Sequence, residues 1–187
     1  MRIISGKNRG LKLTHIGAGD LGNHLRPTSD RVKENIFNLL ENGKTNLSFE
    51  NIRVLDLFAG TGSLGLEALS RGARHVTFFE KSKISLKLLI SNISICNVAK
   101  SVEIRRNDLT NIIKNPDKKF DLVFLDPPYH SNLGEIAISN FLKEGWLSED
   151  SIIVFESNKE ILLKEFECLD CRKYGKTFVN VFRSMNN

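Results

Sequence analysis

The stretch Val54–Gly65 reads VLDLFAGTGSLG, an apolar run that leads into closely spaced glycines and then into a helical pattern. Glycine lets the backbone approach a ligand closely, and the first turn of a helix offers unpaired N–H groups. Gly60, Gly62 and Gly65 match the spacing G-x-G-x-x-G, and Glu80 follows 20 residues after Gly60. The stretch therefore predicts a strand, loop and helix that bind a nucleotide-containing ligand, with Glu80 placed to bind ribose hydroxyls.

Asp56 bears on which ligand the loop binds. The glycine spacing and Glu80 suit NAD(P) as well as S-adenosylmethionine (AdoMet). A carboxylate at the end of the first strand would repel a pyrophosphate, but it suits the ammonium group of a methionine moiety. Asp56 therefore favours AdoMet, and an NAD(P)-dependent oxidoreductase stays as an alternative.

From residue 51 onward the sequence alternates apolar strand patterns with helical patterns. Strands are expected at residues 53–58, 75–80, 102–105, 121–125 and 151–156, and helices at 64–71, 82–96 and 135–141. Near-continuous apolar strands that alternate with helices predict a parallel sheet covered on both faces, an α/β fold. Residues 166–172 and 177–183 flank Tyr174-Gly175-Lys176 and predict a C-terminal antiparallel hairpin.

A second motif, Asp126-Pro127-Pro128-Tyr129, directly follows the predicted strand 121–125. Ligands of open parallel sheets bind at the carboxyl ends of the strands, so this turn is expected to line the same crevice as Gly60 and Gly62. Two prolines donate no N–H and leave carbonyls free, while the Asp126 carboxylate can accept from an amine. The Tyr129 ring can stack on a base. The motif predicts a site for a substrate amine.

The composition excludes several classes of protein. The chain has 187 residues, 41% of them hydrophobic, which suits one globular domain. No apolar run approaches the ~20 residues that cross a bilayer, so no membrane association is expected. Three cysteines do not suit a disulfide framework, which indicates a reducing cytoplasm. Cys168 and Cys171 have C-x-x-C spacing but no second pair, so no metal site is expected.

The net charge of +5 is concentrated at the N-terminus. Residues 1–33 carry seven bases and two acids, whereas the rest of the chain carries 20 of each. A concentrated basic segment is typical of a polyanionic partner, although a solvated surface is the other interpretation. Pro27–Asp30 provides capping residues for a helix whose apolar face is expected at Val32, Ile36, Leu39 and Leu40. The expected RNA contacts are Arg2, Lys7, Arg9, Lys12, Arg26 and Arg31.

Both motifs, together with RIISGKNRGLKL at residues 2–13 and LRPTSDRVKE at residues 25–34, resemble the bacterial 16S rRNA guanine-N2 methyltransferase family RsmD. This resemblance implies a class I methyltransferase (Rossmann-like) fold with a mostly parallel seven-stranded sheet. A basic RNA-positioning hairpin or arm and helix at residues 1–44 would precede a methyltransferase domain at residues 45–187. The implied enzyme is a cytoplasmic monomer that methylates guanine N2 in ribosomal RNA within a small-subunit particle.

The resemblance also implies roles for single residues. Glu80 would bind the ribose of AdoMet, Asp108 the adenine amine, and Asp126 to Tyr129 the target guanine. The implied cofactor contacts are Asp56, Phe58, Gly60, Gly62, Glu80, Asp108 and Asp126, and the implied catalytic residues are Asp126, Pro127, Pro128 and Tyr129. Either Asp126 or water would take the proton that the amine loses.

A further alternative is a non-catalytic RNA-binding or assembly protein that retains the methyltransferase fold. The intact turn from Asp126 to Tyr129 argues against it, because such a protein has no need of an amine-binding site.

Overall fold

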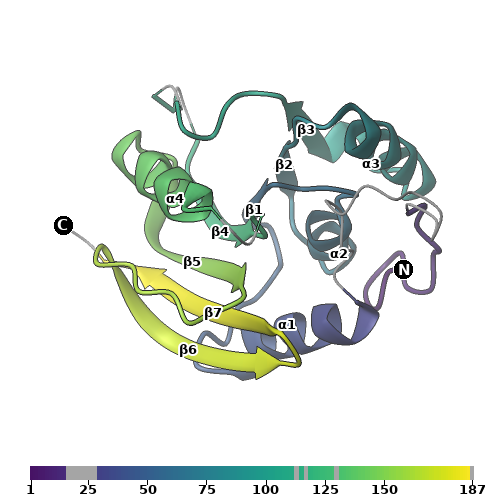
Figure 1. Cartoon of the computed structure of the whole chain (residues 1–187). Coiled ribbons are helices and arrows are strands. Elements are labelled where there is room, and N and C mark those ends of the chain that lie inside the picture. Colours follow the sequence, from purple (N-terminus) through teal and green to yellow (C-terminus); the bar gives the residue numbers. More distant parts are fainter. Residues whose placement is uncertain (16–28, 112–113, 116–117, 129–130, 186–187) are drawn as a thin grey trace.

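The computed structural model describes residues 1–15, 29–111, 114–115, 118–128 and 131–185. Its seven-stranded sheet has the order β3-β2-β1-β4-β5-β7-β6 (Figure 1). The strands are β1 (Arg53–Leu57), β2 (His75–Phe79), β3 (Val102–Arg105), β4 (Phe120–Leu125), β5 (Leu147–Ser157), β6 (Phe166–Tyr174) and β7 (Thr177–Ser184). The helices are α1 (Asp30–Asn42), α2 (Ser63–Ser70), α3 (Lys83–Ile95) and α4 (Leu133–Lys143), with the 3-10 turn η1 (Ala99–Ser101).

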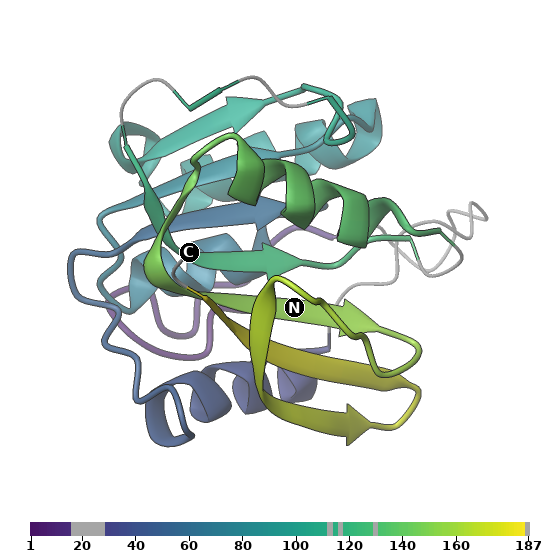
Figure 2. The ribbon, with the colours of Figure 1, turned by 90° about the vertical axis from the view of Figure 1, so that its left-hand side faces the viewer.

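The first five strands pair in parallel, while β7 is antiparallel to both β5 and β6. This arrangement confirms the predicted parallel sheet with a C-terminal hairpin. Helices α1, α2 and α3 lie on one face of the sheet and α4 lies on the other (Figures 1 and 2). None of the helices in the described ranges is long and apolar enough to cross a membrane.

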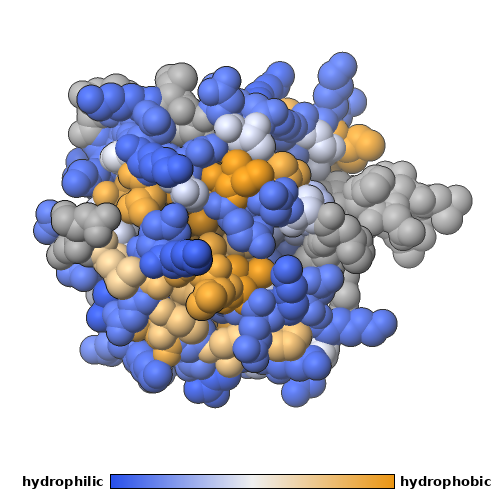
Figure 3. All heavy atoms as spheres, turned by 60° about the vertical axis from the view of Figure 1, so that its left-hand side comes forward, coloured by the Kyte–Doolittle hydropathy of each residue, from blue (hydrophilic) through white to orange (hydrophobic). Residues whose placement is uncertain are grey.

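Alternate residues of each central strand enter two separate cores, as the pleat of a strand requires. In β1, Val54 packs with α1, α2 and α3, whereas its neighbour Leu55 packs with α4. The α4 core includes Trp146, whose ring centroid lies 5.1 Å from that of Phe141. On the face in Figure 3, hydrophilic side chains surround the remaining apolar surface.

Most strand boundaries lie within two residues of the predicted ones, and the start of β5 differs most. β5 begins at Leu147, four residues earlier than expected, with a register shift against β4 between Phe120 and Leu122. The polar run at residues 148–150 hides this start, because it lacks the apolar pattern of a buried strand. β1 ends at Leu57, and Phe58 adopts a left-handed conformation with φ of 62°.

Residues 1–13 fold back on themselves against the domain. The Ile3 N–H donates to the Leu11 carbonyl, and a β-bridge joins Arg2 to Lys12. Ile3 and Leu13 are buried in the same core as α1 and β1. Three features of the sequence analysis lie outside the described residues, namely the loop expected at residues 17–23, Arg26 and Pro27.

The buried face of α1 differs from the predicted one by a partial turn. It consists of Lys33, Ile36, Phe37 and Leu40, while Val32 and Leu39 are only partly buried. Lys33 is fully buried and donates to the Arg2 carbonyl at 2.6 Å. Its ammonium lies 3.9 Å from the Glu67 carboxylate. Lys33 therefore adds no charge to the surface, although the sequence counted it among the N-terminal bases.

Glu67 of α2 binds the N-terminal segment to the domain. This fully buried carboxylate accepts from the Ile4 N–H at 2.7 Å, the Ser5 N–H at 2.9 Å and the Arg71 guanidinium at 2.9 Å. Burial is the main cause that lowers the pKa of Lys33, and the charge of Glu67 opposes it. A paired buried charge of this kind fixes one arrangement of the segments that surround it.

We expect Glu67→Ala to reduce the free energy of unfolding by about 3–5 kcal/mol, because two cations and two N–H groups would lose their buried acceptor. Lys33→Met should reduce the free energy of unfolding by less, since Glu67 keeps three of its partners. Urea denaturation of both variants measures the difference. A larger loss for Lys33→Met would show that Glu67 is not the anchor.

Candidate active site

Three carboxylates follow the carboxyl ends of adjacent strands or lie close to them. Leu57 of β1 is in register with Phe79 of β2 and with Leu125 of β4. The residues that follow these two partners are Glu80 and Asp126, so both lie beside the glycine loop that follows β1. The structure thus brings the two sequence motifs to one edge of the sheet, as parallel pairing requires.

Asp56 lies beneath this edge and is only 3% exposed. Its carboxylate accepts from the Gly65 N–H at 2.9 Å, in the first turns of α2. Burial is the largest cause that raises the pKa of Asp56 to about 8, and the nearby charges of Asp126 and Glu80 raise it further. A buried acid whose ionisation is disfavoured by burial and by two neighbouring carboxylates makes a site that favours a cation.

The loop after β1 contains three residues with left-handed backbone: Phe58 with φ of 62°, Gly60 with 56° and Gly62 with 78°. Phe58 has a side chain that disfavours this conformation, and such strain is typical of functional sites. The backbone of Gly62 packs so closely that a Cβ there would lie 2.4 Å from the Leu89 side chain.

The Glu80 carboxylate braces the glycine loop from β2. One oxygen accepts from the Gly60 N–H at 2.7 Å, and the other accepts from the Ser82 N–H at 2.7 Å. Glu80 is half-buried at this position. The expected ribose-binding acid is therefore held next to the loop that would bind the same ligand.

Asp108 lies farther out, after β3, with an exposed side chain. Its carboxylate pairs with the Lys81 ammonium at 2.6 Å and accepts from the Thr110 N–H and hydroxyl. The hydrogen bond from Lys81 is the main cause that holds the pKa of Asp108 below its usual range. Asp108 is thus ionised and oriented at the next strand end, where the resemblance expects an adenine contact.

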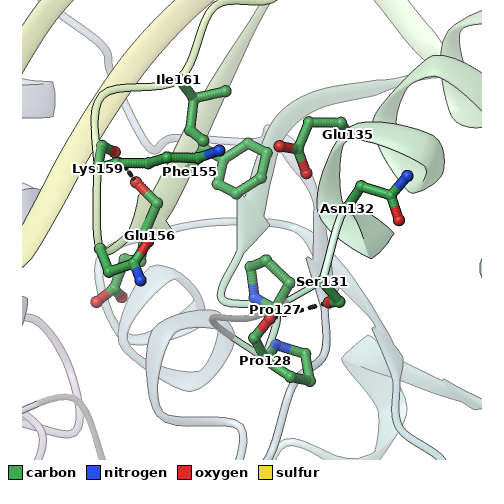
Figure 4. Close-up of a pocket in the computed structure, with 11 residues that line it drawn as sticks. Pro127, Pro128, Ser131, Asn132, Glu135, Phe155, Glu156, Lys159 and Ile161 are labelled. Atoms are coloured by element: carbon green, nitrogen blue, oxygen red, sulfur yellow. Dashed lines mark hydrogen bonds between the residues drawn. The ribbon is translucent and has the colours of Figure 1, made fainter.

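A pocket of about 330 Å³ opens beside the Pro127-Pro128 turn (Figure 4). Its other walls come from the start of α4 and from the end of β5. Tyr129 lies outside the described residues. The sequence analysis missed the polar residues Asn132, Glu135, Glu156 and Lys159, which line this pocket. Glu156 ends the strand predicted at residues 151–156, which pairs with β4. Its position at the carboxyl end of a parallel strand could have identified it as a site residue.

Gly134 allows the start of α4 to pack against the proline turn. A Cβ at Gly134 would lie 2.3 Å from the Phe155 ring and 2.8 Å from the Pro127 ring. Contacts below 3 Å cannot be accommodated without movement of the neighbouring groups. Gly134 therefore sets the width of the pocket beside Pro127.

Two of the expected RNA-contacting bases, Lys7 and Arg9, lie away from this edge. The Lys7 N–H donates to the carbonyl of Ser70, the last residue of α2, whereas the glycine loop begins α2. A helix of this length separates its ends by roughly 12 Å, so Lys7 and the adjacent Arg9 lie at the far end of α2. Arg2 pairs with Asp30 at 3.9 Å, while Lys12 and Arg31 are exposed.

A buried amide connects the N-terminal segment to the glycine loop. Asn92 of α3 is fully buried. Its oxygen accepts from the Thr14 N–H and hydroxyl, both at 2.7 Å. Its nitrogen donates to the carbonyls of Thr14 and Thr61, both at 3.0 Å. The segment before residue 16 and the ligand loop therefore share one side chain.

The fold and the carboxylate-lined glycine loop define a class I methyltransferase. Solved structures show the same architecture. The yhhF protein of Escherichia coli matches with a TM-score of 0.82 and 29% identity, over 100% of this chain and 99% of that one. An RNA methyltransferase from Salinibacter ruber, in complex with S-adenosyl-L-homocysteine, shares the fold with a TM-score of 0.60 and 18% identity, over 87% of this chain and 95% of that one.

The sequence defines the family more narrowly. The profile of the family described as Conserved hypothetical protein 95 matches residues 1–183. A relative from Haemophilus influenzae, named ribosomal RNA small subunit methyltransferase D, is 41% identical over 164 residues, which cover 86% of this chain and 80% of the relative. The chain belongs to this family, the RsmD family that its motifs resemble.

The pKa of Asp56 makes the stability of the ligand-free protein depend on pH. Between the ordinary pKa near 4 and the folded-state value of about 8, the unfolded chain has lost a proton that the folded protein keeps. Stability should therefore fall as the pH rises through this range, by up to about 1.4 kcal/mol per pH unit. Asp56→Asn should abolish this contribution to the pH dependence of stability, while the oxygen of the asparagine amide still accepts from the Gly65 N–H.

Urea denaturation of both proteins at pH 5, 6, 7 and 8 measures the effect. We expect the stability of Asp56→Asn relative to the wild type to increase steadily with pH. Parallel pH profiles for the two proteins would contradict the proposed state of Asp56.

Gly134→Ala tests the pocket beside Pro127. The added methyl group should displace α4 from the proline turn and reduce methyl transfer at least about tenfold, because small misplacements of reacting groups are costly. AdoMet affinity should remain, since Gly134 contacts no part of the glycine loop. Turnover and calorimetric AdoMet binding separate the two effects, and wild-type turnover would contradict this role of Gly134.

Proposed function

We propose that this protein transfers a methyl group from AdoMet to the exocyclic N2 of a guanine in small-subunit ribosomal RNA. The observation that carries the proposal is the position of the Asp126-Pro127-Pro128 turn. It lies between a pocket of about 330 Å³ and the carboxylate-lined glycine loop. A substrate amine and a cationic methyl donor could therefore meet at Asp126.

The charge of the site supports AdoMet over NAD(P). The Glu80 and Asp126 carboxylates would repel a pyrophosphate, and a bound cation would favour ionisation of the buried Asp56 beside them, whereas AdoMet carries a sulfonium and an ammonium. Asp108 would hold the adenine amine, and the backbone of Gly60 and Gly62 would contact the donor closely. The complex of the Salinibacter ruber neighbour with S-adenosyl-L-homocysteine agrees with this assignment.

Bound AdoMet supplies a methyl group that its sulfonium already activates, so the protein needs mainly to position the acceptor. The lone pair of guanine N2 is delocalised into the ring. Hydrogen bonds from N2–H to the Asp126 carboxylate and the Pro127 carbonyl would favour a more tetrahedral nitrogen and stabilise its developing positive charge. Pro127 is buried and Asp126 half-buried, which limits competition from water.

The substrate assignment rests on the relatives. The Haemophilus influenzae relative is named for small-subunit ribosomal RNA, and it matches over most of both chains. We extend this substrate to the present protein, acting as a monomer on a small-subunit particle in the cytoplasm. Residues 1–44 would position the RNA, and Tyr129 would stack on the flipped base.

Methyl transfer can be tested with labelled AdoMet and 16S ribosomal RNA, as transcript and as particle. Digestion to nucleosides should place the label in N2-methylguanosine. Asp126→Asn should lower turnover by about 100-fold, the size expected for loss of one preorganised polar contact. Label in another nucleoside, or wild-type turnover in Asp126→Asn, would contradict the proposal.

A further inference from the structure

A second hollow, of about 410 Å³, lies between the first turns of α1 and the turn that joins β6 to β7. Three of its lining side chains are cationic, namely Arg31, Lys173 and Lys176, and none of the lining residues is acidic. We call this hollow the basic groove. Among the described residues, none of these three cations forms an ion pair with a carboxylate. The groove therefore presents positive charge that no carboxylate of the described residues pairs with.

The walls of the basic groove are held in place by the fold. Ser29 caps α1, because its hydroxyl accepts from the Val32 N–H, and this fixes the helix that carries Arg31. Tyr174 is partly buried against the core of the sheet. The Lys173 ammonium lies 5.1 Å from the centroid of the Phe178 ring, a cation–π contact that orients it. The groove is thus a preorganised surface, and Lys176 is exposed at its rim.

The sheet register places the basic groove on the same edge as the candidate active site. Ser157, which lines the pocket beside Pro127, is in register with Phe178 of β7. The turn that precedes β7 therefore lies one strand beyond the carboxyl end of β5, and neighbouring strands are about 5 Å apart. In Figure 2 the parallel strands end on the right, and the β6–β7 turn and the start of α1 lie on that side.

We infer that the basic groove binds backbone phosphates of the RNA whose guanine enters the pocket beside Pro127. This inference rests on the proposed function and extends its substrate path. Exposed cations are the groups that neutralise phosphates, and the turn of the groove lies one strand beyond the end of β5, whose last residue lines the pocket. Lys7 and Arg9 lie at the far end of α2. The β6–β7 turn therefore adds Lys173 and Lys176 to Arg31, the one base of this groove that the sequence analysis had assigned to RNA.

The test compares Lys173→Gln/Lys176→Gln with the wild type in binding to 16S ribosomal RNA transcript between 50 and 200 mM salt. The variant lacks two phosphate contacts, which should lower the slope of log affinity against log salt concentration by roughly 1.4–1.8. The wild type should therefore lose about tenfold more affinity than the variant over this range. AdoMet affinity and turnover at saturating RNA should not change. Glutamine retains side-chain length, and circular dichroism checks that the hairpin still folds.

Lys100→Gln/Lys118→Gln is the matched control. It removes two exposed charges that precede β3 and β4, at the opposite edge of the sheet, and should leave the salt slope unchanged. An unchanged slope in Lys173→Gln/Lys176→Gln, with normal RNA binding by the wild type, would overturn the inference alone. Weaker binding only to assembled particles would indicate a ribosomal protein at the groove and would also overturn it. A wild type that methylates no RNA would overturn the proposed function itself.

Discussion

The burial of Asp56 beside two further carboxylates, at one edge of the sheet, is the constraint on which the site depends. Parallel strands end together, so the acids that follow or end β1, β2 and β4 cannot avoid one another. The protein stabilises them with backbone donors: the Gly65 N–H for Asp56, and the Gly60 and Ser82 N–H groups for Glu80. The pKa of Asp56 nevertheless stays at about 8, chiefly because its carboxyl group is buried and further because Asp126 and Glu80 lie nearby. A bound cation would relieve the remaining cost, which links the fold to the choice of cofactor.

Buried polar contacts connect the N-terminal segment to α2 and to the glycine loop. Glu67 holds residues 4 and 5 against α2, and Asn92 holds Thr14 next to the Thr61 carbonyl of the glycine loop. Breaking such a contact would leave a buried polar group without a hydrogen bond, which is costly in free energy. These contacts therefore fix the segment firmly. The N-terminal segment and the glycine loop that would bind the cofactor therefore share the Asn92 side chain.

Much of the fold and site could be predicted because their signals are contiguous in the sequence. The glycine loop and the Asp-Pro-Pro-Tyr turn each follow an apolar strand, and their shared edge follows from parallel pairing. The orientation of α1 could not be predicted, because Lys33 is buried only through Glu67, which is 34 residues away in the sequence. The basic groove was missed for the same reason, since Arg31 and Lys176 meet only in the folded chain.

The charge argument at the centre of this account can be measured directly by titration calorimetry of the purified protein. The carboxylate-lined loop should bind AdoMet at a single site and should give no binding heat with NADH, whose pyrophosphate it repels. The result that would contradict the account is NADH binding as tight as AdoMet binding.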